Sequence, residues 1–439
     1  MCGRLRGRKS PLFAYGTMKT NLESVFMKNI NILLLSGAVF AVLIGECRIG
    51  SAADDVLIEV SSGKYSRENC VISCSLPKEF QTEPEVHLVS IESGQTIPAQ
   101  IDRFHKETQL VWILENTMPE ETTRKYKLRK GPGDDRSRPH VQMTSDDQQV
   151  IVVSNNKPVL KYNMAIVKSP IRGESYYDKS GYIHPLYTPS GEVITDDFNP
   201  DHPHQHGIMF AWRKVIFEGR ESNGWDQKSQ SGEVVHRKLG ALTSGPVFGR
   251  FSAQIDHVDL TGPDGPVTVL HEIWNVRVYA IQNRFLFDLE SVQKCAADKP
   301  VTIAKIHYGG MTLRGRADWA KRRDYNYLTS DGNDKSNGNQ TRPQWVEMYG
   351  PVGNHSAGVT MLCDPRNFCS PQPVRLHPTM PYLCFAVAAL DEFSILPGTP
   401  YVSRYRVAVH DGKGSSTQNQ QLWNDFTDPP VVSVVPSVR

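Results

Sequence analysis

Short apolar runs separated by turn residues fill the chain from residue 56 to residue 128. Their sequences are VLIEV, CVISCSL, VHLVSI, LVWIL and YKL. Runs of this length, bounded by turn-forming residues, are typical of β-strands. The pattern predicts a small Ig-like β-sandwich over residues 54–130. The segment 131–139 that follows combines glycine and proline with charged residues, so residues 131–144 are expected to form a linker.

Beyond the expected linker, the β pattern resumes and continues almost to the end of the chain. The runs expected as strands cover residues 149–153, 159–167, 207–217, 251–260, 267–281, 285–292, 302–308, 358–363, 382–389 and 401–410. No stretch shows a sustained helical period with caps. Strands of this number and length predict an all-β chain whose main body is a large antiparallel β-sandwich of two packed sheets. This body is expected over residues 145–415, with a C-terminal tail at 416–439.

A targeting segment is expected before the first strand. Lys28 precedes an apolar run at 30–44, roughly 15 residues long, and small residues follow at 51–53. A membrane-spanning helix needs about 20 apolar residues, and this run also contains Asn31 and Ser36. We therefore expect residues 1–53 to be a signal peptide and leader, so that the mature chain has no stable membrane span and is periplasmic or secreted.

Charge and cysteine usage narrow the partners and the chemistry. The formal net charge of the 439 residues is +2, whereas a domain that binds nucleic acid through bulk charge is strongly basic. The expected partner is a carbohydrate or another small molecule, with no nucleic acid. Cys2 and Cys47 fall in the leader, and the other six cysteines could form up to three disulfides or remain buried thiols. Cys363 and Cys369 bracket a turn and are the best local pair.

The segment 180–212 holds the densest group of chemically reactive side chains. It contains His184, His202, His204 and His206, together with Asp196, Asp197 and Asp201. In an extended conformation His202, His204 and His206 would point to one side, where imidazoles can share a divalent metal ion. Pro203 favours a loop or a sheet edge instead. Two other interpretations stay open: the histidines act as acid and base without a metal, or they brace a turn.

A second polar group lies on the run 267–281. Alternation places His271, Asn275, Arg277 and Tyr279 on one face, and the opposite face is mostly apolar. The apolar face is expected to join the core, and the polar face to form a wall of a cleft. Histidine and tyrosine can supply an acid or a base there, while arginine and asparagine can hold a sugar. An ordinary solvated strand face is the alternative.

A glycine-rich turn at residues 309–315 follows an expected strand. Its glycines permit close backbone approach, and Arg314 could bind a carboxylate or sulfate with two N–H groups. Trp319 follows closely and is a candidate for stacking on a sugar, although aromatic residues at this density mostly form core. The turn is not a phosphate-binding P-loop, because the Lys-Ser/Thr ending is missing.

Three of these motifs resemble a known family. The runs GYIHPLY at 181–187 and DHPHQHG at 201–207, with the turn at 308–315, are similar to an exported bacterial family labelled "methane oxygenase PmoA". The resemblance covers roughly residues 149–412. The label does not carry over as a function, since a methane monooxygenase membrane subunit is built from several transmembrane helices. The resemblance implies instead a supersandwich similar to galactose mutarotase, other aldose epimerases and some polysaccharide lyases.

These features predict an exported carbohydrate-active protein that uses acid–base chemistry at a sugar carbon, either epimerisation or β-elimination. The expected catalytic residues are His184, His204, His206, His271 and Tyr279, and the expected substrate-binding residues are Asn275, Arg277, Arg314 and Trp319. One alternative is an oxidoreductase or hydrolase that binds a divalent metal ion through His202, His204 and His206. The other is a non-catalytic glycan-binding or cell-envelope protein.

Overall fold

The computed structural model describes residues 56–104, 107–133 and 140–435. The leader expected at residues 1–53 lies outside these ranges. Antiparallel β-strands are the main regular structure of the described chain and helices are few, which confirms the expected all-β class with a large β-sandwich preceded by a smaller one.

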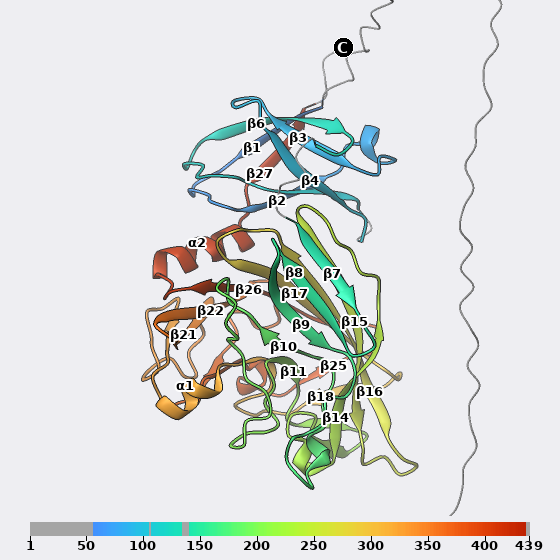
Figure 1. Cartoon of the computed structure of the whole chain (residues 1–439). Coiled ribbons are helices and arrows are strands. Elements are labelled where there is room, and N and C mark those ends of the chain that lie inside the picture. Colours follow the sequence, from blue (N-terminus) through green and yellow to red (C-terminus); the bar gives the residue numbers. More distant parts are fainter. Residues whose placement is uncertain (1–55, 105–106, 134–139, 436–439) are drawn as a thin grey trace, which may run out of the picture. The chain divides into compact units, whose positions relative to one another are not determined.

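Seven strands form the small sandwich (Figure 1). They are β1 (Val56–Ser61), β2 (Val71–Ser75), β3 (Val86–Ser90), β4 (Thr96–Asp102), β5 (Gln109–Ile113), β6 (Thr123–Lys130) and β27 (Val431–Val435), in the spatial order β2-β5-β4-β3-β6-β1-β27. Alternate apolar positions such as Ile58 and Val60 are fully buried around Trp112. Strand β27 pairs with β1, so the segment expected as a C-terminal tail completes this sheet.

The large sandwich contains three sheets. The first has the order β23-β24-β19-β11-β10-β9-β8-β7 and comprises β7 (Val141–Ser145), β8 (Gln149–Ser154), β9 (Lys157–Asn163), β10 (Tyr182–Leu186), β11 (Ile208–Ala211), β19 (Gly310–Arg314), β23 (Val374–Leu376) and β24 (Tyr382–Phe385). The second has the order β14-β15-β16-β17-β26-β22-β21-β20 and comprises β14 (Gly232–Leu239), β15 (Phe248–Asp259), β16 (Val267–Tyr279), β17 (Phe285–Cys295), β20 (Asn326–Thr329), β21 (Trp345–Val352), β22 (His355–Cys363) and β26 (Tyr401–Asp411).

The third sheet of the large sandwich is short and has the order β13-β12-β18-β25. Its strands are β12 (Val215–Phe217), β13 (Arg220–Ser222), β18 (Val301–Ile303) and β25 (Phe393–Ile395). The run expected as one strand at 207–217 is therefore divided between two sheets, with β11 in the first and β12 in the third. Two packed sheets were expected, and this third one was not.

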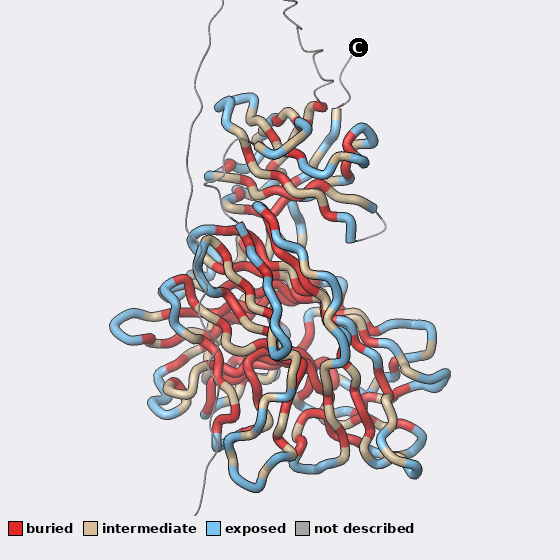
Figure 2. Tube along the Cα trace, turned by 45° about the vertical axis from the view of Figure 1, so that its right-hand side comes forward, coloured by how far each residue is buried: buried red, intermediate tan, exposed pale blue. Residues whose placement is uncertain are grey.

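The core of the large sandwich follows the alternation visible in the sequence. On β16, Trp274, Val276 and Val278 are fully buried and lie in one hydrophobic cluster with Phe251 of β15 and Phe287 of β17. Burial of each such side chain contributes about 1.5–3 kcal/mol. Figure 2 shows the buried positions concentrated along the strands and the exposed positions in the connecting loops. The prediction that this face of the run 267–281 joins the core is confirmed.

Helices are short, and the longest was missed by the sequence analysis. Helix α1 (Ala317–Arg322) has six residues, and α2 (Ser416–Thr427) has twelve. Helix α2 starts with a capping box in which Ser415 and Gln418 satisfy each other's backbone N–H groups. It is anchored through Asp425, which accepts a hydrogen bond at 2.8 Å from the buried Arg67 of the small sandwich. The S-x-x-Q spacing was the available signal for this helix.

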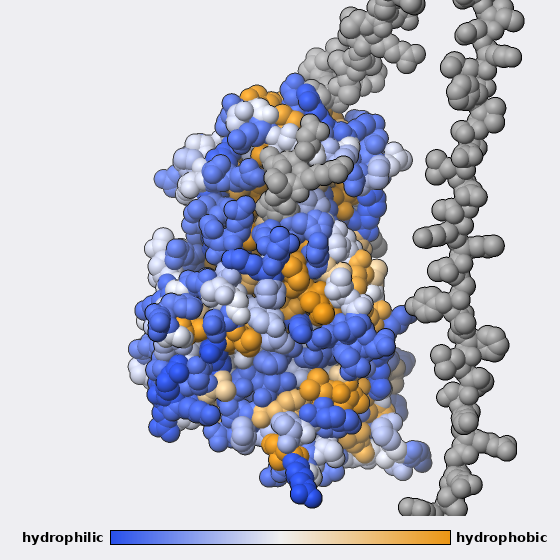
Figure 3. Space-filling view, in the orientation of Figure 1, coloured by the Kyte–Doolittle hydropathy of each residue, from blue (hydrophilic) through white to orange (hydrophobic). Residues whose placement is uncertain are grey.

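Two further sequence expectations concern cysteines and membranes. Each of the six cysteines in the described ranges is a free thiol, so the Cys363–Cys369 pairing is not formed. Cys363 is buried and accepts a hydrogen bond from Asn367, whereas Cys369 is exposed. No helix in the described part of the chain is long and apolar enough to cross a membrane. The face drawn in Figure 3 is mainly hydrophilic, with its hydrophobic residues in separate patches.

Candidate functional site

The DHPHQHG motif folds as consecutive turns between β10 and β11. The His202 N–H donates to the Asn199 carbonyl at 2.9 Å, and the Gln205 N–H donates to the His202 carbonyl at 3.0 Å. The chain is therefore not extended here, and the expected one-sided alternation of the three histidines is lost. Gly207 ends the motif because a Cβ at this position would lie 2.0 Å from the Ile183 carbonyl oxygen.

His206 points into the protein interior. Its side chain is fully buried, and Nδ1 donates to Asp197 at 2.5 Å. The Tyr182 hydroxyl donates to the other oxygen of the same carboxylate at 2.7 Å. Burial lowers the pKa of His206, although Asp197 opposes this effect. The neighbouring His184 is partly buried, shares a hydrogen bond of 2.9 Å with Thr195, and also has a pKa lowered by burial.

The expected metal-ligand set is therefore not formed, because His206 faces away from His202 and His204. Within the described ranges, no group of three or more His, Cys, Asp or Glu side chains has a geometry that could hold a metal ion.

His202 and His204 instead line a pocket of about 250 Å³, which we call the histidine pocket. Its lining consists of the imidazoles of His202, His204, His307 and His377, the rings of Trp225, Tyr308 and Tyr382, the charged side chains of Asp226 and Arg375, and Gln205. These residues come from the DHPHQHG turns, the loop after β13, the loop between β18 and β19, and strands β23 and β24. Side chains from distant parts of the sequence thus converge on one cavity.

The rings of the histidine pocket pack against one another. The ring centroids of His202 lie 5.6 Å from His204 and 5.9 Å from His377. Trp225 packs edge to face against Tyr308 at 5.7 Å and against Tyr382 at 5.8 Å. Edge-to-face contacts of this kind fix ring orientation. The pocket therefore has an ordered aromatic wall beside its imidazoles.

The imidazoles of the pocket are neutral near pH 7. Burial, followed by the nearby positive charge of Arg375, lowers the pKa of His377 to about 4. Burial likewise lowers the pKa of His204 to about 4, although Asp226 opposes it. The pKa values of His202 and His307 are also lowered, mainly by burial. A neutral imidazole can accept a proton, so each ring can act as a base.

Two contacts orient these imidazoles. His204 Nδ1 lies 3.8 Å from the Asp226 carboxylate, which itself accepts a hydrogen bond from the Lys228 N–H. His377 Nδ1 accepts from the Thr379 N–H at 3.3 Å. In the neutral His377 ring the proton is therefore on Nε2, and this nitrogen is a donor.

Two buried polar atoms of pocket-lining residues have no hydrogen-bond partner in the described chain, His202 Nδ1 and the Tyr382 hydroxyl. Behind the pocket wall, Arg314 Nη2 also has no partner among the described residues. Burial, with a smaller contribution from the Cys384 thiol, raises the pKa of Tyr382, so its hydroxyl keeps its proton. Native proteins satisfy nearly all buried polar groups. Unpartnered polar atoms of residues that line a cavity are available to bond a ligand.

Arg314 lies behind the pocket wall. Its side chain is fully buried, Nη1 donates to Gln205 at 3.1 Å, and Nε lies 3.6 Å from Asp196. Burial lowers its pKa, although Asp196 opposes this. The sequence analysis placed this residue in contact with the substrate, whereas the structure places Gln205 between Arg314 and the cavity.

The other expected site residues do not line the histidine pocket. On β16, Asn275 donates to Glu290 at 3.0 Å, Arg277 pairs with Asp102 of the small sandwich, and Tyr279 donates to Asp288 at 2.6 Å. We call these three residues the polar stripe. Each is bonded to a carboxylate of this chain. Asn275 and Arg277 also line a separate pocket of about 170 Å³, so this polar face does border a small cavity, but that cavity is not the histidine pocket.

His271 and Trp319 also lie elsewhere. The His271 side chain is 60% exposed, and its Nδ1 bonds to Asp256 at 2.7 Å. Trp319 is fully buried in α1, where Nε1 donates to the Pro351 carbonyl at 2.8 Å. Trp319 is therefore a core residue, with no face free for stacking on a sugar.

Arg375 and His377 line the histidine pocket but were not expected there from the sequence. Arg375 and His377 belong to the run VRLH at 374–377, where Val374 and Leu376 are buried in the core. This run alternates apolar and polar residues, which places Arg375 and His377 on one side of an extended chain. The same reasoning that was applied to the DHPHQHG motif would have found them. Asp226 and Tyr382 carried no comparable signal.

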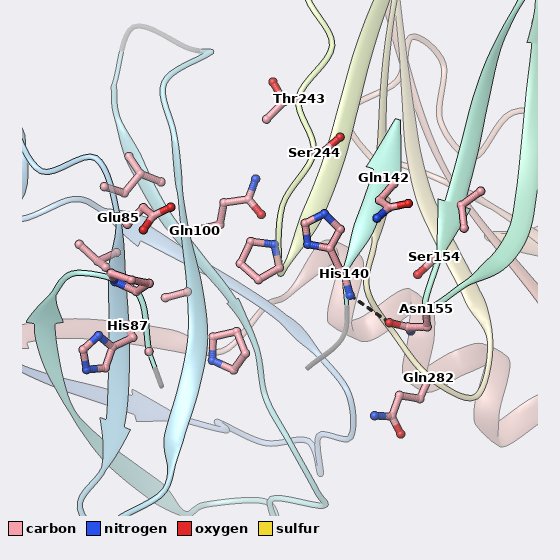
Figure 4. Close-up of a pocket in the computed structure, with 18 of the residues that line it drawn as sticks. Glu85, His87, Gln100, His140, Gln142, Ser154, Asn155, Thr243, Ser244 and Gln282 are labelled. Carbon is pink, nitrogen blue, oxygen red and sulfur yellow. Dashed lines mark hydrogen bonds between the residues drawn. The ribbon is translucent and has the colours of Figure 1, made fainter. Parts of the chain in front are cut away.

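Another cavity has a volume of about 1020 Å³ and is lined by residues of both sandwiches (Figure 4). Its labelled side chains are mainly neutral and polar, and the His140 N–H donates to Asn155 at 3.0 Å. His87 is bonded to the Gly131 carbonyl at 2.9 Å. This cavity brings together no acid–base group comparable to the histidine pocket.

Comparisons with known proteins give a family but no activity. No curated protein matches the chain. Among solved structures, it is similar to a glycosyl hydrolase family 38 protein from Enterococcus faecalis (7% identity, TM-score 0.42, 88% of this chain and 48% of that one). It is also similar to an α-mannosidase from Enterococcus faecalis (8% identity, TM-score 0.41, 88% and 46%) and to a family 36 α-galactosidase from Geobacillus stearothermophilus (7% identity, TM-score 0.32, 62% and 41%).

The chain thus spans less than half the length of these solved proteins. The family model described as "Family of unknown function (DUF6807)" matches residues 149–424, which include the whole histidine pocket. This match covers more than half of the chain, and the chain therefore belongs to the family DUF6807.

Proposed function

We propose that this chain is a carbohydrate-active protein that binds a sugar in the histidine pocket and changes it by acid–base chemistry. The observation that carries the proposal is the convergence of four imidazoles, a carboxylate and an unpaired guanidinium on one cavity. A volume of about 250 Å³ is below the roughly 300–1,000 Å³ of pockets for drug-sized ligands, so it suits a single sugar ring. The aromatic wall and the polar lining match a ring that carries hydroxyl groups.

His204 is the best candidate for the base. Its imidazole is neutral at pH 7, and Asp226 lies beside Nδ1, where it can stabilise the imidazolium that forms. Tyr382 is the best candidate for the acid, because its buried hydroxyl is protonated and has no hydrogen-bond partner in the described chain.

Two reactions fit this pair of residues, and both begin when His204 takes a carbon-bound proton and leaves its electron pair on the carbon. In epimerisation, Tyr382 gives its proton to the opposite face of that carbon, and the proton on His204 returns to Tyr382 through solvent. In β-elimination, the electron pair forms a double bond while the neighbouring C–O bond breaks, and the leaving oxygen takes a proton from Tyr382. Neither reaction needs an oxidant or a reductant.

We also propose that this protein is exported. The expected leader would deliver the chain to the periplasm or the exterior, where polysaccharides of cell walls and biomass are found. Membership in the exported family labelled "methane oxygenase PmoA" is part of this proposal, and the oxygenase activity in that label is not.

The test is deuterium exchange at sugar carbons. The chain would be incubated in D₂O with glucose, galactose, glucuronate and galacturonate, and with short oligomers of each, and C–H signals would be followed by NMR. We expect exchange that falls at least 100-fold in His204→Gln, since a positioned base contributes about 10²–10⁴-fold. His271→Gln is the matched control and is expected to stay within twofold, because His271 is exposed and outside the pocket.

Two outcomes would contradict the proposal. If His204→Gln and His271→Gln lost exchange equally, the reaction would not take place in the histidine pocket. Sugars that bind in the pocket without any exchange would show a glycan-binding protein rather than an enzyme. Thermal melting of each variant would confirm that it is folded before activity is compared.

A further inference from the structure

Arg375 is the arginine that lines the histidine pocket, and no carboxylate lies within bonding distance of it in the described chain. It lies on β23, the edge strand of its sheet, between the buried Val374 and Leu376. Its guanidinium makes no hydrogen bond or ion pair with another residue in the described ranges, yet it lines the cavity. An arginine presents a planar fork of N–H donors that matches a carboxylate.

Two buried arginines of the large sandwich show the contrast with Arg375, which is half-buried. Arg250 donates to Asp102 at 2.6 Å, and Arg406 donates to Asp288 at 2.6 Å. The guanidinium of Arg375 has no such carboxylate, so its N–H groups are available to a ligand in the cavity.

The charged and titratable groups that face Arg375 leave it available. The pocket contains one carboxylate, Asp226, which lies near His204 and accepts the Lys228 N–H. The imidazoles are neutral, and Tyr308 and Tyr382 are phenols. Arg314 adds a second positive charge behind Gln205, close to Asp196. The pocket therefore contains a positive charge, on Arg375. It also contains a candidate proton acceptor, His204, with the Asp226 carboxylate beside it.

This polarity matters for the proposed chemistry. A proton bound to a sugar carbon becomes acidic when the adjacent carbon carries a carboxyl group, because that group can take up the electron pair. The charge that develops on the carboxylate oxygens must then be neutralised, and a fixed guanidinium does this without reorganisation. A neutral sugar offers neither the acidic carbon nor a partner for Arg375.

We infer that the histidine pocket takes a sugar acid, a uronate residue, whose carboxylate is held by Arg375 and whose adjacent carbon faces His204. The inference rests on the proposed function and adds the substrate class. In the elimination, the C–H electron pair becomes a C=C bond as the neighbouring C–O bond breaks. The leaving oxygen takes the Tyr382 proton, and the proton on His204 returns through solvent to Tyr382.

The test compares binding of sugar acids with binding of their neutral counterparts. The full chain would be titrated calorimetrically with galacturonate and glucuronate, with galactose and glucose, and with inorganic sulfate. We expect each acid to bind at least 10-fold more tightly than its neutral counterpart. Arg375→Gln should abolish this preference, which corresponds to a loss of roughly 10- to 100-fold for a charge-assisted pair. Arg375→Lys should restore only part of it, since the fork is lost.

The controls separate this inference from the proposed function. His271→Gln should bind the acids as the unmodified chain does, and the fold of Arg375→Gln should persist because the side chain has no partner to lose. Equal binding of acid and neutral sugars, unchanged in Arg375→Gln, would overturn the sugar-acid inference and leave the sugar pocket standing. Arg375-dependent binding of sulfate without binding of any sugar would overturn both.

Discussion

The polar stripe and the histidine pocket are built from the same kinds of side chain but differ in where their partners come from. In the polar stripe, Asn275, Arg277 and Tyr279 each donate to a carboxylate of this chain. In the histidine pocket, His202 Nδ1 and the Tyr382 hydroxyl have no partner among the described residues. Residue type alone therefore does not distinguish the two regions. The donors of the stripe are paired within the fold, although Asn275 Oδ1 also has no partner among the described residues.

The difference has an energetic meaning. A buried charge costs several kcal/mol unless an opposite charge compensates it, and the polar stripe finds its compensation within the fold. The histidine pocket leaves His202 Nδ1 and the Tyr382 hydroxyl without a partner among the described residues, and under the proposed function a bound sugar would supply one. Substitutions in the stripe should therefore reduce stability and leave binding unchanged, while substitutions in the pocket should do the opposite.

The largest effect is expected for Asp102→Ala. This carboxylate is 3% exposed and is shared by Arg250 and Arg277. Its removal leaves two largely buried guanidinium groups without a counter-charge, which typically costs about 3–5 kcal/mol. Urea denaturation would measure the lowered free energy of unfolding, and sugar binding at a temperature where the variant is folded should be unchanged.

A matched control for Asp102→Ala is Glu83→Gln, also in the small sandwich. Glu83 pairs with Lys130, whose side chain is 54% exposed. An exposed pair contributes less than about 1 kcal/mol. If the two substitutions reduced the free energy of unfolding equally, or if Asp102→Ala abolished sugar binding, the contrast between the regions would be wrong.

The next effect is the pH dependence of the pocket. The pKa values of His204 and His377 are lowered to about 4, from 6.5 in the unfolded chain. Between these values the unfolded chain binds more protons than the folded one, so the free energy of unfolding falls as the pH falls from 6.5 to 4. We expect a contribution of about 1–3 kcal/mol at pH 4.5, allowing for the partial exposure of both rings.

The measurement for this pH effect is a pair of urea denaturation series at pH 7.5 and pH 4.5. The control is the double variant His204→Gln with His377→Gln, which cannot take up these protons. It should lose about 1–3 kcal/mol less on acidification than the unmodified chain. Parallel losses in both proteins would mean that these two imidazoles do not titrate as described.

A smaller effect is expected from a comparison of two buried tyrosines. The Tyr279 hydroxyl donates to Asp288 at 2.6 Å, whereas the Tyr382 hydroxyl has no partner in the described chain. Tyr279→Phe should reduce the free energy of unfolding by about 1–2 kcal/mol without affecting catalysis. Tyr382→Phe should change it by less than about 0.5 kcal/mol and reduce turnover. If instead Tyr382→Phe lowered the free energy of unfolding and Tyr279→Phe reduced turnover, the polar stripe would be the catalytic region and the histidine pocket the structural one.

The sequence predicted those features that depend on neighbouring residues. Alternation along residues 267–281 correctly separated the buried Trp274, Val276 and Val278 from the polar stripe, because side chains of a strand point to opposite faces. It did not reveal what the stripe faces. Asp102 lies 175 positions away from Arg277 and belongs to another sandwich, and no local pattern carries that contact.

The histidine pocket was only partly predictable for the same reason. The density of His202 and His204 identified the region, but the turns that end at Gly207 direct His206 into the interior. Arg375 and His377 reach the pocket only because β23 pairs with β24 in the same sheet as β19 and β11. Sheet order is a tertiary property, so one segment of the site, the turns with His202 and His204, could be expected from the sequence, while the assembly of the site could not.

The smallest effect is expected for His271→Gln, and it tests whether an exposed acid–base pair has any role. His271 bonds to Asp256 at 2.7 Å, but its side chain is 60% exposed, and Arg237 donates to the same carboxylate at 2.8 Å. Partial burial raises the pKa of Asp256, but the bonds from His271 and Arg237 outweigh this effect and lower the pKa overall. Removal of His271 leaves Asp256 paired with Arg237, so the free energy of unfolding should change by less than about 0.5 kcal/mol. Sugar binding should not change, because neither residue lines the histidine pocket. A loss of binding in His271→Gln, measured beside an unaffected Tyr279→Phe, would show that the outer end of β16 contributes to a site that its hydrogen bonds do not reveal.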